Sequence, residues 1–266
     1  MEKTSVLRVA ILATMLGFSG AAVAAPARSK PRHGKPRPAT PGVTLPWCAE
    51  ELETLPNGLC HVDGGQPEGR RTLVVFLHGA IAKDVDWQWL QERALARLAK
   101  QNKFEAIFAR APLGPTGYVW HGTSADPSTE QELLDSWKEA RTYLERRAER
   151  KFDEVFLMGF SSGAYFASSL ALRGRGNFDG YAVFAGGSSM APRGGDAPTK
   201  APVYVGVCAK DRQTADHSRA FGATLAARGF PHRVDEQPVG HMFSDIHMAH
   251  AVAYLRKRGR DELAAR

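Results

Sequence analysis

The sequence predicts an α/β fold, in which helices cover both faces of a mostly parallel central sheet. Three observations support this prediction. Short apolar runs alternate with longer segments of helical spacing from Thr72 onward, as in successive βα units. The first run, 72–77, is apolar enough for a buried strand. The chain has 266 residues, 43% of them hydrophobic, which suits one full α/β domain and is too short for two large ones.

The first half of this region predicts two strands and two helices. The strand 72–77 leads into His78-Gly79-Ala80, and segment 87–100 follows with apolar residues at helical spacing. A second strand is expected over 104–109. After a polar, glycine-containing stretch, Ser128 and Gln131 form a capping-box pattern that predicts a helix from 128 to about 150.

The second half continues this pattern with four strands and three helices. The apolar runs 154–158, 179–184, 202–208 and 232–238 are expected to be strands, and turn residues follow them. Helical spacing predicts helices over 164–172, 215–228 and 243–256. The longest insert lies between Ala111 and Ser128, so we expect no large lid domain. The catalytic domain is expected to span 47–266.

The first 24 residues have the features of a secretory signal peptide. Lys3 and Arg8 precede an apolar stretch, and the segment ends with the small-residue pattern Ala22-Val23-Ala24. Ser19 and Gly20 interrupt the apolar run too early for a spanning helix, which disfavours an uncleaved anchor. We therefore expect a secreted or periplasmic product with no transmembrane segment in the mature protein.

The segment 25–46 holds most of the basic excess. It has five basic residues, no acidic residue and many prolines, so it is expected to be disordered. Acidic cell-surface polymers are one candidate partner, and a solvated spacer without a partner is the alternative. Because the rest of the chain is nearly neutral, nucleic acid is not an expected partner.

The three cysteines fit an oxidising compartment. Cys48 and Cys60 are close in sequence, and we expect them to form a disulfide; two free thiols are the alternative. The third cysteine, Cys208, lies inside a strand pattern and is expected to be a buried apolar residue.

The strongest motif is Gly159-Phe160-Ser161-Ser162-Gly163, between a predicted strand and a predicted helix. A nucleophilic serine needs a strained turn at this place, and glycines two residues to either side leave room for it. A serine in a glycine-rich turn is otherwise often only a turn former. The flanking strand and helix favour Ser161 as a nucleophile.

These motifs resemble the α/β-hydrolase superfamily over residues 72–256. Within it, the chain looks like the small carboxylesterases, the dienelactone hydrolases and the secreted polyester or feruloyl esterases. The resemblance implies that the acid and the base follow the nucleophile in the chain, and Asp211 and His241 each lie just past a predicted strand. Asp216 is the alternative acid. His241 is then the general base, and Asp211 orients and stabilises its ring.

The oxyanion hole is expected to consist of the backbone N–H groups of Ser162 and Ala80. The first opens the helix after the nucleophile, and the second lies in the His-Gly-x pattern of the superfamily. Ala-Ile-Ala follows His78-Gly79 in place of a run of glycines, which argues against the glycine-rich esterase subgroup. His78 itself is expected to brace this loop.

Several aromatic residues are candidates for substrate binding. Trp120 and Phe243, and beside them Trp87 and Trp89, lie in or near loops of the expected active edge; core packing is the alternative for each. His247 and His250 have a spacing that allows a metal shared with His241, but no cluster of Asp, Glu or Cys completes such a site. We therefore expect no metal and no cofactor.

The predicted function is hydrolysis of carboxylic esters through an acyl-enzyme intermediate. The expected substrate is a small-molecule or polymer-derived ester. The alternatives are a peptidase or thioesterase on the same scaffold, which the same three residues would serve, and a non-catalytic secreted binding module.

Overall fold

The structure is a computed structural model that describes residues 46–66, 69–83, 85–121, 126–188 and 197–264. The predicted signal peptide and nearly all of the basic segment 25–46 lie outside the described residues. In the parts of the chain that are described, no helix is long and apolar enough to cross a bilayer.

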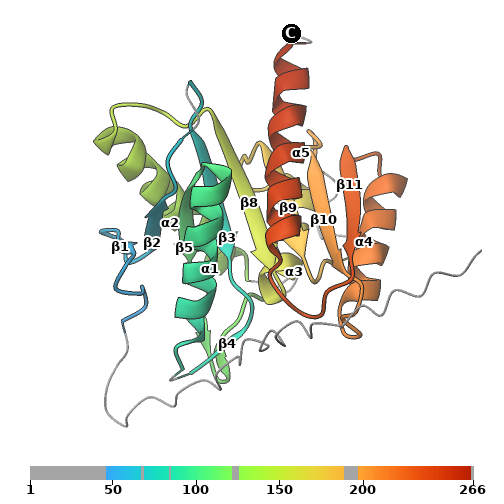
Figure 1. The fold of residues 1–266 in the computed structure, drawn as a ribbon, viewed down its shortest axis with the longest axis horizontal. Coiled ribbons are helices and arrows are strands. Elements are labelled where there is room, and N and C mark those ends of the chain that lie inside the picture. Colours follow the sequence, from blue (N-terminus) through green and yellow to red (C-terminus); the bar gives the residue numbers. More distant parts are fainter. Residues whose placement is uncertain (1–45, 67–68, 84, 122–125, 189–196, 265–266) are drawn as a thin grey trace, which may run out of the picture. The chain divides into compact units, whose positions relative to one another are not determined.

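The described residues build an eight-stranded sheet with the order β1-β2-β5-β3-β8-β9-β10-β11 (Figure 1). In this order, the six strands β5, β3, β8, β9, β10 and β11 are parallel. The antiparallel hairpin of β1 and β2 extends the sheet beside β5. The strand bounds are β1 Glu53–Thr54, β2 Cys60–Asp63, β3 Thr72–Leu77, β5 Glu105–Ala109, β8 Glu154–Phe160, β9 Gly180–Phe184, β10 Val203–Cys208 and β11 His232–Gln237. The predicted α/β class is confirmed.

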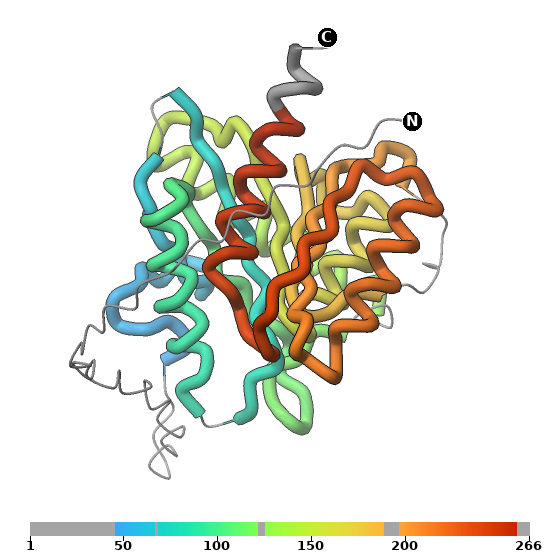
Figure 2. The backbone as a smooth tube through the Cα atoms, turned by 45° about the vertical axis from the view of Figure 1, so that its right-hand side comes forward, coloured from blue at the N-terminus to red at the C-terminus, as the bar shows by residue number. Residues whose placement is uncertain are grey.

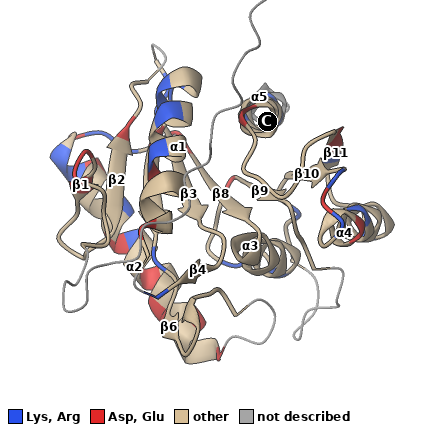
Figure 3. Cartoon of the chain, turned by 60° about the horizontal axis from the view of Figure 1, so that its bottom comes forward, with Lys and Arg blue, Asp and Glu red and all other residues tan. Residues whose placement is uncertain are grey.

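Helices cover both faces of this sheet. On one face lie α1 (Trp87–Asn102) and α5 (Asp245–Ala264), which run side by side (Figure 2) and are joined by an ion pair between Arg97 and Asp245. On the other face lie α2 (Pro127–Arg147), α3 (Ser162–Arg173) and α4 (Ala215–Ala227). Figure 3 shows that α2 and α4 contain both acidic and basic residues.

The two faces have separate cores because side chains alternate along each strand. In β3, Val74 and Phe76 belong to the core that includes residues of α1 and α5, whereas Val75 and Leu77 belong to the core that includes residues of α2, α3 and α4. Every residue of β3, β5, β8, β9 and β10 is buried. A strand that is buried on both faces needs apolar residues at nearly every position, which explains the continuous runs in the sequence.

Besides the hairpin of β1 and β2, which was not predicted, the structure differs from the sequence prediction at three places. The N-cap of α2 is Asp126, whose carboxylate accepts the N–H groups of Ser128 and Thr129, and Pro127 occupies the first turn. The predicted Ser128 cap is therefore wrong; Asp caps a helix well, and Pro fits the first turn without losing a hydrogen bond. The helix α5 begins two residues later than expected and continues to Ala264.

The third difference is a small second sheet beside the main one. It has the order β4-β7-β6 and consists of β4 Ile81–Ala82, β6 Leu113–Gly114 and β7 Gly117–Tyr118. Strands of two residues leave no periodic pattern in a sequence, which is why this sheet was not predicted. It matters because β4 follows Ala80 directly.

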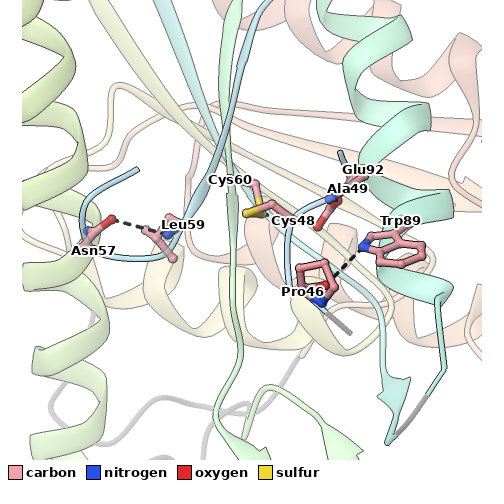
Figure 4. The surroundings of a disulfide bond; sticks show 8 residues. All are labelled: Pro46, Cys48, Ala49, Asn57, Leu59, Cys60, Trp89 and Glu92. Carbon is pink, nitrogen blue, oxygen red and sulfur yellow. Dashed lines mark hydrogen bonds between the residues drawn. A yellow bond between two sulfur atoms is a disulfide. The ribbon is translucent and has the colours of Figure 1, made fainter. Parts of the chain in front are cut away.

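The predicted disulfide between Cys48 and Cys60 is confirmed (Figure 4). It joins the segment before β1 to the first residue of β2, and its Cα atoms lie 5.4 Å apart. The remaining cysteine, Cys208, is free and buried in β10, as expected.

Candidate active site

Ser161 lies on a strained turn between β8 and α3. Its backbone has φ 52° and ψ −117°, a conformation that L residues rarely adopt. Such a conformation costs about 1–3 kcal/mol and persists only where the surroundings enforce it. The N–H group of Ser161 donates to the carbonyl of Phe184 at 3.0 Å, which ties the turn to the end of β9. The turn lifts the Ser161 side chain out of the sheet at the carboxyl end of β8.

The two flanking glycines are required by close backbone packing. A Cβ atom on Gly159 would lie 2.3 Å from the carbonyl oxygen of Gly163. A Cβ atom on Gly163 would lie 2.3 Å from the carbonyl oxygen of Leu77 in β3. Both distances are far below any van der Waals contact, so no other residue fits at either position without moving the backbone. The Gly-x-Ser-x-Gly spacing is thus a packing requirement of this turn.

The structure brings Ser161, His241 and Asp211 together from three separate loops. Nε2 of His241 lies 2.9 Å from Oγ of Ser161, and Nδ1 of His241 lies 2.6 Å from Oδ2 of Asp211. Asp211 follows β10, and His241 lies between β11 and α5. In a neutral imidazole with Nδ1–H facing the carboxylate, Nε2 accepts the Ser161 hydroxyl proton. This arrangement meets the geometric requirement for an activated nucleophile.

Asp211 is held as a carboxylate. It is buried, and burial by itself would raise the pKa. Hydrogen bonds from the Thr214 hydroxyl, from His241 and from the Gln213 N–H outweigh burial, so the pKa of Asp211 lies below its usual value. The charge needed opposite the imidazole is therefore present at neutral pH.

Asp216, the alternative acid, is not brought to His241. Its side chain is 94% exposed on the first turn of α4 and pairs with Arg219. Asp211 is the carboxylate that reaches the imidazole. Thr214, which sequence reasoning missed, lies three residues after Asp211 and orients its carboxylate; a hydroxyl at this spacing from an Asp is a typical local hydrogen-bond partner.

The loop after β3 passes beside Ser161. A Cβ atom on Gly79 would lie 3.3 Å from Cβ of Ser161. The N–H group of Gly79 donates to Oε1 of Gln91 at 2.9 Å, so it is already used. The next amide, that of Ala80, stays a candidate oxyanion donor, together with the amide of Ser162, the first residue of α3. Gln91 was not found from the sequence, because nothing in its pattern distinguishes it from other helical glutamines.

His78 is a buried, neutral residue at the base of this loop. Burial lowers its pKa to about 4. Its Nδ1–H donates to the Gly79 carbonyl at 2.5 Å, and its Nε2 accepts the N–H of Ala111 at 3.1 Å. These two bonds need opposite roles from the two ring nitrogens, which only the neutral ring provides. His78 thereby joins the loop after β3 to the chain beyond β5.

The two aromatic residues expected to bind substrate have different surroundings. Trp120 is 3% exposed, stacks on Phe166 and donates its indole N–H to the His78 carbonyl at 3.0 Å. Of the two alternatives left open, core packing therefore describes Trp120, and the expected substrate contact is wrong. Phe243 is half-buried and packs on Phe76 and Phe160, and Phe160 also packs on His241 with ring centroids 5.0 Å apart.

A further polar pair, Tyr165 and His217, lies near Ser161, His241 and Asp211. The hydroxyl of Tyr165 and Nδ1 of His217 are 2.6 Å apart and join α3 to α4. Burial and the charge of Asp211 raise the pKa of Tyr165. This pair was not predicted from the sequence, because Tyr165 and His217 are 52 residues apart and belong to no motif.

The described residues contain no cluster of three metal-ligating side chains. His250 pairs with Asp235, and His247 is buried in the core against Gly206. A cavity of about 380 Å³ lies between α2 and the loop after α3, but it is not lined by Ser161, Asp211 or His241. The candidate active site is therefore located by the hydrogen bonds among these three residues and not by the size of a cavity.

Comparison with protein families gave one match. The model of the dienelactone hydrolase family matches residues 120–263, which is more than half of the chain and includes Ser161, Asp211 and His241. No curated protein matched the sequence.

Many solved structures share the fold. The carboxylesterase from Mesorhizobium loti is similar with a TM-score of 0.54 and 19% identity, over 78% of this chain and 99% of that one. The Bacillus cereus carboxylesterase has a TM-score of 0.55 and 16% identity, over 75% of this chain and 94% of that one. A fungal esterase from Rhizomucor miehei has a TM-score of 0.57 and 15% identity, over 81% and 84% of the two chains. At sequence identities this low, the similarity shows only that the fold is shared.

Proposed function

Because the chain belongs to the dienelactone hydrolase family, we propose that it hydrolyses carboxylic esters through an acyl-enzyme intermediate on Ser161. The observation that carries this proposal is the pair of hydrogen bonds that joins Ser161, His241 and Asp211 on one edge of the sheet. The strained conformation of Ser161 supports it further, because strain of this kind is kept at functional sites.

In the first half of the reaction, Oγ of Ser161 attacks the ester carbonyl carbon while Nε2 of His241 takes the hydroxyl proton. The carboxylate of Asp211 stabilises the imidazolium that forms. The carbonyl oxygen becomes negative, and the amides of Ala80 and Ser162 donate to it. The bond to the alcohol oxygen then breaks, and His241 returns the proton to the departing alcohol.

The second half repeats these steps with water. His241 takes a proton from a water molecule, whose oxygen attacks the acyl group on Ser161. When the second tetrahedral intermediate collapses, the bond between the acyl carbon and Oγ of Ser161 breaks, and His241 returns the proton to Oγ. The carboxylic acid leaves, and the Ser161 hydroxyl is restored. Both halves use the same donors, so no group beyond those described is needed.

The proposal is tested with the variant Ser161→Ala and a fluorophosphonate probe. The variant is expected to lose turnover of p-nitrophenyl acetate by about 10⁴-fold or more and to lose labelling, with an unchanged circular dichroism spectrum. Substantial turnover by the pure variant would refute the serine nucleophile. A panel of matched ester, thioester and peptide substrates then separates an esterase from a thioesterase or peptidase, which the probe alone does not distinguish.

The proposal includes export of the protein. The pattern of residues 1–24 and the disulfide between Cys48 and Cys60 support it, because disulfides persist in oxidising compartments. Expression of the full chain followed by amino-terminal sequencing is expected to give a product that begins at Ala25. A cytoplasmic product that retains Met1 would argue against export.

A further inference from the structure

The segment 46–60, which we term the strap, is fastened to the domain at several points. The disulfide joins Cys48 to Cys60 at the start of β2. The N–H of Ala49 donates to Oε2 of Glu92 at 2.6 Å, and the indole N–H of Trp89 donates to the Pro46 carbonyl at 3.3 Å (Figure 4). The first residues of the strap are therefore held against α1 and β2.

Trp47 lies between these fastening points, and its ring packs on the rings of Tyr118, His78 and Phe108. Its centroid is 4.8 Å from that of Tyr118 and 5.4 Å from that of His78. The guanidinium of Arg110 lies over both Trp47 and Tyr118 and donates to the Tyr118 hydroxyl at 3.0 Å. Nε1 of Trp47 is buried and has no hydrogen-bond partner among the described residues, so ring contacts and the Arg110 guanidinium place the indole without a hydrogen bond.

Two residues that Trp47 contacts, His78 and Tyr118, support the chain on either side of the Ala80 amide. His78 lies two residues before Ala80 and ties down the Gly79 carbonyl. Tyr118, in β7, pairs with Ile81, the residue directly after Ala80. Trp47 thus touches the support on each side of the same amide. The pairing of β4 with β7 has only two residue pairs, so it is a weak support by itself.

We propose that Trp47 is a positioning residue for the Ala80 amide, held in place by the disulfide at the adjacent Cys48. This inference rests on the proposed function, because it assigns a role within the same site. The Ala80 N–H donates to the substrate oxygen when negative charge develops there. A misplaced Ala80 amide therefore stabilises the transition state less well, and substrate binding is unchanged. The strap therefore supports kcat and has little influence on KM.

The test compares Trp47→Leu with Trp47→Phe and with the double variant Cys48→Ala/Cys60→Ala. A displacement on the order of 1 Å in an active site costs up to about 10²-fold in rate, so Trp47→Leu and the double variant are expected to lose at least about tenfold in kcat with KM within about twofold. Trp47→Phe keeps a ring and loses no hydrogen bond, so its kcat is expected to return to within about threefold of the wild type.

Leu52→Ala is the matched control. Leu52 is a buried apolar residue of the same strap, and it packs in the core on the α1 face. All variants are assayed on p-nitrophenyl acetate at a temperature below their unfolding transitions, with near-UV circular dichroism to verify the fold. Leu52→Ala is expected to lose stability and to keep kcat. If Trp47→Leu does not fold, the double variant and Trp47→Phe carry the comparison.

Three results would overturn the inference. An unchanged kcat in Trp47→Leu and in the double variant would show that the strap does not position the amide. An equal loss of kcat in Leu52→Ala would show a general effect of strap stability. If the wild type and Ser161→Ala both fail to hydrolyse esters, the proposed function and this inference fall together, whereas an active wild type and an inactive Ser161→Ala leave the proposed function standing.

Discussion

Glu92 makes the stability of this protein depend on pH. Its side chain is fully buried in α1 beside the disulfide, and it accepts the N–H of Ala49. Burial raises its pKa to about 7, from 4.5 for an exposed Glu. The folded protein therefore binds a proton between these two values, where the unfolded chain does not.

The sign of the effect follows from this proton. Stability rises with pH only where the unfolded state binds more protons, and here the folded state binds more. The stabilising contribution is fully present below a pH of 4.5 and is lost as the pH rises through about 7. The two pKa values correspond to about 3 kcal/mol between the acidic and the alkaline limits.

The variant Glu92→Gln removes the titration and keeps an acceptor for the Ala49 N–H. We expect its free energy of unfolding, relative to the wild type, to increase by about 3 kcal/mol between pH 4.5 and pH 8.5. Urea denaturation of both proteins at the two pH values, with the disulfide intact, measures this change. Glu51→Gln is the control, because Glu51 is a half-exposed carboxylate of the same strap, whose pKa is lowered by its hydrogen bond with Arg93. A difference between Glu92→Gln and wild type that is the same at both pH values would refute the reasoning.

Three further predictions concern the site and the amino-terminal segment. Asp211→Asn is expected to lower kcat by about 10⁴-fold through the wrong imidazole tautomer, and Asp216→Asn to leave it unchanged; equal effects on p-nitrophenyl acetate turnover would contradict the assignment of the acid. Gly163→Ala is expected to cost more than about 3 kcal/mol of stability, whereas Gly240→Ala, with nothing within 4 Å of its added Cβ, should leave the thermal midpoint nearly unchanged. Removal of residues 25–46 is expected to abolish salt-sensitive adhesion to acidic polymers, and equal adhesion of the truncated protein would dismiss that partner.

Much of the fold could be read from the sequence, because its elements leave local signals. Strands buried on both faces require unbroken apolar runs, and the amphipathic helices show a helical period. The turn at Ser161 also leaves a local pattern, because Gly159 and Gly163 leave no space for side chains and the two glycines stand two residues to either side of Ser161. The two cysteines of the disulfide are also close in the sequence, with a separation of only 12 residues.

Several of the elements that escaped prediction depend on contacts between distant segments. The strands β4, β6 and β7 are two residues long and exist because the loops after β3 and β5 meet. The contact of Trp47 with His78 and the bond between Tyr165 and His217 also join remote parts of the chain. No periodicity or spacing encodes such contacts, since neither partner has a local reason to be where it is.

The sequence by itself determined the α/β class and the glycine-flanked turn that presents Ser161, and the family resemblance of its motifs predicted Asp211 and His241 as partners of Ser161. Only the tertiary structure decided that Asp211 and not Asp216 reaches His241, and that Trp120 packs in the core. The physical reason is that five residues separate the two carboxylates, and the start of α4 turns one into the site and the other into solvent. A choice of this kind depends on how α4 packs against the sheet.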